Sequence, residues 1–280
     1  MNHDAAQADI TMEVLPPKTL APDDLAALKR AVDLLEHPGL AARLANMAGK
    51  PIEILGGALP GSASRVIASA TTRALEAALQ VAVRTMRTGR TGSDVLHRAL
   101  ATASGAAGGA FGLAALPVEL PTSTVIMLRS IAEIARGEGE DLTNPETALA
   151  CVQVFALGGR SSSDDAAESG YFAVRSLLAK SVSEAARYIA ERSLLEEGGP
   201  ILVRFITQVA ARFGVVVTQK VAAQALPLIG ALGGAAVNYV FIEHFQSMAR
   251  GHFAVRRLER LYGKDVIQAE YERLARPGSK

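Results

Sequence analysis

The sequence predicts an all-α protein, a multi-helix bundle with glycine- and alanine-rich, proline-kinked apolar helical hairpins. Apolar residues recur at helical spacing through most of the chain, as Leu25, Leu28, Val32 and Leu35 do near its start. Short joints rich in glycine and proline separate these segments. The chain has no two-residue turn flanked by alternating strands, which would signal a β-hairpin.

The chain is expected to form one helical domain, residues 23–275, between a flexible leader, residues 1–22, and a tail, residues 276–280. The first helix has Asp23 as its N-cap, and the Pro-Gly step at 38–39 ends it. The leader is polar and acidic and lacks the basic and apolar regions of a secretory signal.

The remaining helices follow one another with small-residue joints between them. Asn144 is expected to cap the helix that begins at Pro145, and Pro117 and Pro121 are expected to interrupt the chain between two others. In chain order these helices are expected at 63–87, 95–116, 122–136, 146–157, 166–195, 201–213, 216–225, 228–249 and 252–261, with a last one ending at Ala275. The helix at 63–87 has a basic face formed by Arg65, Arg73, Arg84 and Arg87.

An internal echo recurs at three of the joints. The segments "GGALPGSAS" (56–64), "FGLAALPVELPTS" (111–123) and "AAQALPLIGALGGAA" (222–236) each contain Ala-Leu-Pro next to glycines. Glycine pairs four residues apart, such as Gly57 and Gly61, lie on one helix face and let a partner helix approach closely. A soluble bundle and a membrane bundle explain this packing equally well.

Two stretches are long enough to cross a bilayer. Ala99–Val118 has 20 residues without a charge and Val221–Ile242 has 22, and a spanning helix needs about 20. Alanine and glycine dominate both, however, and the acidic Glu119 costs about 2.5–3.5 kcal/mol at a helix centre. Arginines flank both ends of each stretch, which disfavours a single crossing. A re-entrant hairpin turning at Pro117 and Pro121, an interfacial insertion and a soluble core remain open.

Composition excludes some classes of function. The net charge of +1 and the pI of about 7.9 give no nucleic-acid footprint. Tryptophan is absent and aromatic residues make up 5% of the chain, so an aromatic membrane belt is poorly supplied. The single cysteine, Cys151, lies among apolar neighbours and suits a reducing cytoplasm as a small buried hydrophobe.

Polar residues within the apolar segments are the candidates for a functional site. The expected buried polar cluster consists of Glu119, Arg129, Glu133, Asn238, Glu243 and His244. Arg129 and Glu133 are four residues apart and can pair, so the cluster is either a structural ion-pair set or the lining of a polar cavity. A third reading is a metal-dependent hydrolase with a carboxylate–histidine site, although adjacent Glu243 and His244 point about 100° apart on a helix. The sequence identifies no catalytic residue, cofactor or metal ligand.

Several long segments resemble one family. "LPVELPTSTVIMLRSIAEIARGEGEDL", "ALACVQVFALGG", "ESGYFAVRSLLA" and "AAQALPLIGALGGAAVNYVFIEHFQSMARGHFAVRRLERLYG" are similar to the EcsC family. The resemblance runs from Asp24 to Tyr271 and is strongest at 114–180 and 221–263. It implies a bacterial protein that acts beside an ABC exporter linked to protein secretion, and it carries no catalytic residues.

Together these observations lead us to expect a non-enzymatic protein that is peripheral to, or partly inserted in, the inner membrane from the cytoplasmic side. Its expected partners are membrane lipid and an ABC transporter, with no nucleic acid and with an oligomeric state left open. The alternative is a soluble helical protein whose oily helices bind a lipid or another apolar ligand.

Overall fold

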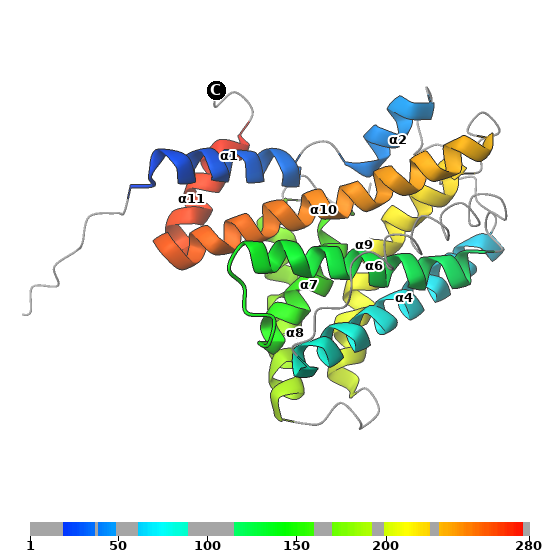
Figure 1. Ribbon diagram of the computed structural model, residues 1–280, viewed down its shortest axis with the longest axis horizontal. Coiled ribbons are helices and arrows are strands. Elements are labelled where there is room, and N and C mark those ends of the chain that lie inside the picture. Colours follow the sequence, from blue (N-terminus) through cyan, green and yellow to red (C-terminus); the bar gives the residue numbers. More distant parts are fainter. Residues whose placement is uncertain are drawn as a thin grey trace, which may run out of the picture.

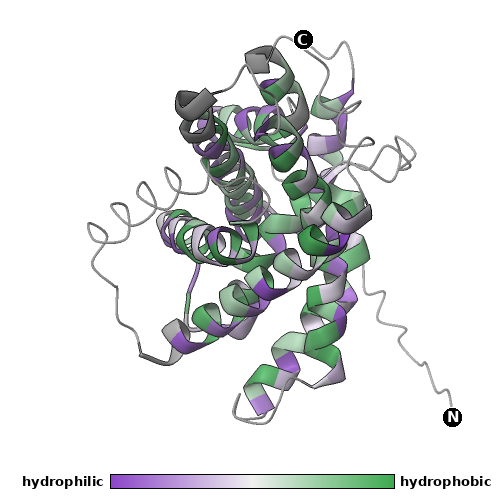
Figure 2. Cartoon of the chain, turned by 90° about the vertical axis from the view of Figure 1, so that its right-hand side faces the viewer, coloured by the Kyte–Doolittle hydropathy of each residue, from purple (hydrophilic) through white to green (hydrophobic). Residues whose placement is uncertain are grey.

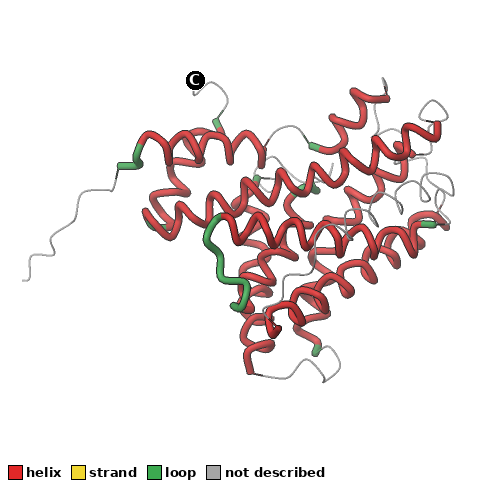
Figure 3. The backbone as a smooth tube through the Cα atoms, in the orientation of Figure 1, coloured by secondary structure: helices red, strands yellow, loops and turns green. Residues whose placement is uncertain are grey.

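The all-α prediction is confirmed. The structure is a computed structural model that describes residues 19–36, 39–48, 61–88, 115–159, 170–191, 199–224 and 230–276, and these residues form nine helices and no strand (Figures 1 and 3). The helices are α1 (Pro22–Glu36), α2 (Leu40–Ala48), α4 (Gly61–Thr88), α6 (Leu116–Gly137), α7 (Pro145–Leu157), α8 (Tyr171–Glu191), α9 (Pro200–Gln224), α10 (Gly230–Tyr262) and α11 (Lys264–Ala275).

The longest helix, α10, connects the rest of the bundle. Its 33 residues span about 50 Å at 1.5 Å per residue, and it contacts α1, α2, α6, α7, α9 and α11 (Figure 1). Gly251 lies inside it because α1 approaches closely there: a Cβ at this position would lie 2.6 Å from Cγ of Leu35. After Tyr262 the chain turns at Gly263, whose φ of 96° favours glycine, and enters α11.

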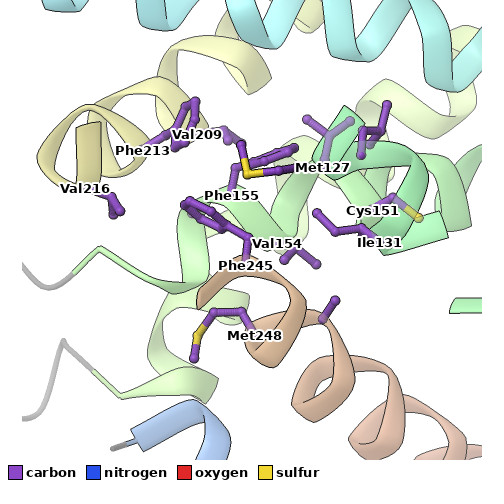
Figure 4. Close-up of a cluster of buried hydrophobic side chains, with 14 of the residues drawn as sticks. Met127, Ile131, Cys151, Val154, Phe155, Val209, Phe213, Val216, Phe245 and Met248 are labelled. Atoms are coloured by element: carbon purple, nitrogen blue, oxygen red, sulfur yellow. The ribbon is translucent and has the colours of Figure 1, made fainter. Parts of the chain in front are cut away.

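The centre of the bundle is α7. Every residue from Thr147 to Ala156 is buried, so this helix is covered on all sides and carries no amphipathic pattern. The ring of Phe155 lies 5.1 Å from that of Phe213 and 5.2 Å from that of Phe245, so α7, α9 and α10 share one aromatic core (Figure 4). Asn144 caps this helix as expected, since its Oδ1 accepts a hydrogen bond of 2.8 Å from the backbone N–H of Glu146.

Three predicted helix boundaries are replaced by continuous helix. α9 runs through Gly214 and α10 through Gly251, because glycine lowers helix stability by only about 1 kcal/mol and packing offsets that loss. α6 runs from Leu116 through both Pro117 and Pro121 to Gly137. Pro117 occupies the first turn, where its missing N–H would have no helical partner. The turn at these prolines that a re-entrant hairpin would need, one of the alternatives left open, is therefore not formed. The predicted helix at 95–116 lies almost wholly outside the described residues.

Four helix ends that border the Ala-Leu-Pro segments of the sequence lie at one end of the bundle. α4 begins at Gly61, α6 at Leu116 and α10 at Gly230, while α9 ends at Gln224, and these four helix ends lie together on the right of Figure 1. Figure 2 looks at the molecule from this side, and hydrophilic residues interleave with hydrophobic ones along its helices. We call this region, defined by those four helix ends, the Ala-Leu-Pro end.

Candidate functional site

A buried ion pair lies at the Ala-Leu-Pro end. Glu119, in the first turn of α6, accepts a hydrogen bond of 2.7 Å from Nζ of Lys220 on α9, and Lys220 is fully buried, with 0% exposure. The same Nζ lies 4.6 Å from the ring centroid of Phe241 on α10, a cation–π contact. Burial lowers the pKa of Lys220 and the charge of Glu119 opposes that shift. With Phe241 the pair therefore joins three helices, and it makes no further hydrogen bond among the described residues.

Lys220 is the site residue that the sequence analysis missed. It directly precedes the uncharged stretch Val221–Ile242, and a lysine at the edge of an apolar segment is expected to be exposed to solvent. The available signal was helical spacing: Phe213, Val216 and Val217 are buried on α9, and Lys220 falls three residues after Val217 on the same face.

The other candidates on α6 are separated. Glu133 is exposed and bonds Arg136 at 2.7 Å, not Arg129. Nη1 of Arg129 is buried without a hydrogen-bond partner. Arg129 borders a cavity of about 50 Å³ that is otherwise lined by apolar side chains. The lining residues are Val81, Ala82, Leu128, Arg129, Ala132, Leu142, Ala148 and Cys151. Burial raises the pKa of the Cys151 thiol to about 12, so it stays a protonated core residue.

Two further candidates lie on α10 with different surroundings. Glu243 bonds Arg43 of α2 and accepts a hydrogen bond of 2.8 Å from Ser247. His244 is buried against Gly158 at the end of α7, where a Cβ would collide with its Nε2. Burial, followed by the charge of Arg43, lowers its pKa to about 4. The imidazole is therefore neutral at pH 7 and acts as a packed core group.

Asn238 lies one turn before Ile242 on α10, and it is buried with its Oδ1 unpaired. Within the described ranges, no group of three or more histidine, cysteine, aspartate or glutamate side chains could hold a metal ion. The carboxylate–histidine set of Glu119, Glu133, Glu243 and His244 thus does not form such a group there.

A second buried polar network joins α8 to α10. The hydroxyl of Tyr171 lies 2.9 Å from Nδ1 of His252 and accepts a hydrogen bond of 3.2 Å from Arg175. Arg175 also donates two hydrogen bonds, of 2.7 and 3.0 Å, to Glu259. Burial raises the pKa of Tyr171 and lowers that of His252. The regular spacing of Tyr171 and Arg175, four residues apart, was the only sequence signal for this network.

Three arginines that follow the uncharged stretch Val221–Ile242 form ion pairs with carboxylates of the protein. Arg256 donates two hydrogen bonds to Glu140, of 2.8 and 3.0 Å, and Arg260 bonds the same carboxylate. Burial alone would raise the pKa of Glu140, but the hydrogen bonds and charges of these arginines lower it. Arg257 bonds Glu138 and Asp24. Sequence analysis treated these arginines as a membrane flank, whereas they fasten α10 to α1 and to the loop after α6.

An open groove runs along the first half of α4 beside the start of α6. It has a volume of about 410 Å³ and is lined by Ser62, Arg65, Val66, Ser69, Ala70, Arg73 and Pro117. Arg65 and Arg73 are exposed, and neither takes part in an ion pair or hydrogen bond with the described residues. Next to Pro117, the side chain of Val118 is 76% exposed.

Two described helices are long and apolar enough to cross a membrane by length and composition, Gly61–Arg84 of α4 and Pro200–Gln224 of α9. Less than half of their most apolar windows, about 44% and 39%, is buried in the bundle, so core packing accounts for only part of their apolar character, and two such helices are weak evidence of membrane association.

No curated protein and no solved structure matches the sequence. One family model does match, and it covers residues 24–258, which is most of the chain and includes the Glu119–Lys220 pair and the groove. The chain belongs to the EcsC protein family.

Proposed function

We propose that this protein is a membrane-associated helical protein without enzymatic activity. It docks on the cytoplasmic face of the inner membrane through its Ala-Leu-Pro end and acts beside a membrane transporter. The observation that carries this proposal is the convergence of three Ala-Leu-Pro helix starts at one end of the bundle (Figure 1).

The sequence next to these helix starts is apolar. Residues 99–114, which lead into α6, contain no charge, and neither do residues 225–229, which link α9 to α10. The described helix ends next to these segments, at Leu116, Gln224 and Gly230, belong to the Ala-Leu-Pro end. In the proposed docking, the apolar segments enter the inner leaflet.

Docking suits the bundle better than spanning. The exposed positions of α4 include Arg65, Arg73, Glu76 and Arg84, and each charge at the centre of a spanning helix costs about 2.5–3.5 kcal/mol. α9 likewise exposes Arg204. A bundle with such faces remains in water, and in this proposal only its Ala-Leu-Pro end reaches the lipid.

The transporter partner rests on the family resemblance, which associates these proteins with an ABC exporter. A soluble protein with a pocket for an apolar ligand has weaker support. The apolar cavity beside Arg129 encloses about 50 Å³, and ligand pockets usually enclose roughly 300–1,000 Å³.

Two exposed valines provide a matched test. Val118 is 76% exposed near the start of α6, and Val203 is 58% exposed near the start of α9. The start of α9 lies far from the Ala-Leu-Pro end in Figure 1. In fractionated cells we expect the wild type and Val203→Asp to sediment with membranes and Val118→Asp to shift toward the soluble fraction. A wild-type protein that stays soluble, or equal behaviour of the two variants, would contradict the proposal. Circular dichroism verifies that both variants are folded.

A further inference from the structure

We infer that the groove between α4 and the start of α6 binds the phosphate headgroup of an anionic phospholipid at the bilayer surface. This inference rests on the proposed membrane association and identifies the residues that select the lipid.

The groove is a single stripe of α4 closed on one side by α6. Its α4 members occur at spacings of three, four, seven, eight and eleven residues from Ser62, which place them on one helix face. Arg65 and Arg73 are eight residues apart, so their Cα atoms lie about 12 Å apart along the axis. Ser69 lies between them, and its hydroxyl can donate to the same anion.

Arg65 and Arg73 have no carboxylate partner among the described residues. Arg175, Arg256 and Arg257 each bond a glutamate, whereas Arg65 and Arg73 bond nothing in the described part of the chain. A guanidinium presents paired N–H donors that match phosphate oxygens. Two unpaired guanidinium groups on either side of a hydroxyl thus form a complementary surface for a phosphate.

The surroundings favour a lipid in a bilayer over a free phosphate. Val66, Ala70 and Pro117 form an apolar floor, and the exposed Val118 follows at the rim. A headgroup bound by the arginines would place its glycerol and upper acyl carbons against these apolar atoms. The N-termini of α4 and α6 lie beside the groove, and the positive ends of their helix dipoles favour an anion there.

One carboxylate opposes this binding. Glu76 is exposed on the same face of α4, one turn beyond Arg73, and it forms no ion pair in the described ranges. Its charge repels an anionic surface, so removing it should strengthen the interaction.

The test measures binding of the full chain to vesicles by cosedimentation. The vesicles contain either phosphatidylglycerol mixed with phosphatidylcholine or phosphatidylcholine alone. The double variant Arg65→Gln/Arg73→Gln should bind the anionic vesicles about 30-fold more weakly, because each basic residue at an anionic surface contributes about fivefold. Glu76→Gln should bind them several-fold more tightly.

The control is Arg30→Gln/Arg187→Gln, which removes two exposed arginines on α1 and α8 and should bind as the wild type does. Equal loss in both double variants would reduce the effect to net charge and overturn the inference. So would wild-type binding by Arg65→Gln/Arg73→Gln, or an equal loss on phosphatidylcholine alone. If the wild type binds neither vesicle, the proposed membrane association fails as well, which distinguishes the two failures.

Discussion

Replacing Glu119 with leucine removes the only carboxylate partner that a fully buried lysine has among the described residues. Lys220 has 0% exposure, and its Nζ lies 2.7 Å from the carboxylate that the substitution deletes. Breaking a buried pair from one side destabilises a protein by about 3–5 kcal/mol. The lysine can reduce this penalty by losing its proton. Deprotonating a lysine at pH 7, roughly 3.4 units below its reference pKa, costs about 1.4 kcal/mol per unit and therefore about 5 kcal/mol in total.

We therefore expect Glu119→Leu to lower the free energy of unfolding at pH 7 by about 3–5 kcal/mol. The double variant Glu119→Leu/Lys220→Met removes both charges and should return to within about 1 kcal/mol of the wild type, or exceed it. In the single variant the unfolded state binds one proton more than the folded state. Its stability should accordingly rise between pH 7 and 9, by up to about 1.4 kcal/mol per unit.

Urea unfolding followed by circular dichroism measures all three free energies. The reasoning is refuted if Glu119→Leu lies within about 0.5 kcal/mol of the wild type, which is the usual range for surface substitutions. It is also refuted if the double variant is as unstable as the single one, because the loss would then come from packing and not from an unpaired charge.

Three further predictions follow from the packing of the core. The pKa of His244 is lowered to about 4 in the folded protein, so the unfolded state binds its proton more readily. The free energy of unfolding should therefore fall by about 3 kcal/mol between pH 6.5 and 4. Urea midpoints measured across this range should depend less on pH in His244→Gln than in the wild type. Gly158→Ala should lower the free energy of unfolding by about 1–3 kcal/mol, because the added Cβ meets His244. Gly214→Ala on α9 has open space around it and should raise that free energy by about 0.5–1 kcal/mol. Thermal melts compare the two variants, and equal shifts of the melting temperature would contradict the packing. Cys151, buried with a raised pKa, should react with iodoacetamide only in urea, and mass spectrometry of the native protein should find it unmodified.

The sequence was informative where a residue acts locally. Asn144 followed by Pro145 predicted the start of α7, and the helix begins there with the expected cap. Gly263, at the break before α11, also acts locally, since its positive φ is set within one turn. Gly251 misled because its cause is remote: Leu35 lies more than 200 positions earlier in the chain and packs against it.

The candidate site shows the same division. Glu119 was identified as an unusual charge, because a carboxylate between two prolines in an apolar stretch can be recognised from the sequence alone. Its partner was not, since Lys220 is 101 residues away and reads as an ordinary flank. The same limit applies to Arg256, whose pairing with Glu140 spans 116 residues. Local spacing predicts which side chains share a helix face, while tertiary packing decides which of them are neutralised.

The most direct test of membrane docking through the Ala-Leu-Pro end is the depth of a probe at two positions. A polarity-sensitive fluorophore is attached to Val118→Cys or to Val203→Cys in a Cys151→Ala background, and a lipid-phase quencher is added with anionic vesicles. We expect the probe at position 118 to shift to shorter wavelength and be quenched, and the probe at position 203 to stay unchanged. Two unchanged probes on vesicle-bound protein, or stronger quenching at position 203, would contradict the proposed orientation.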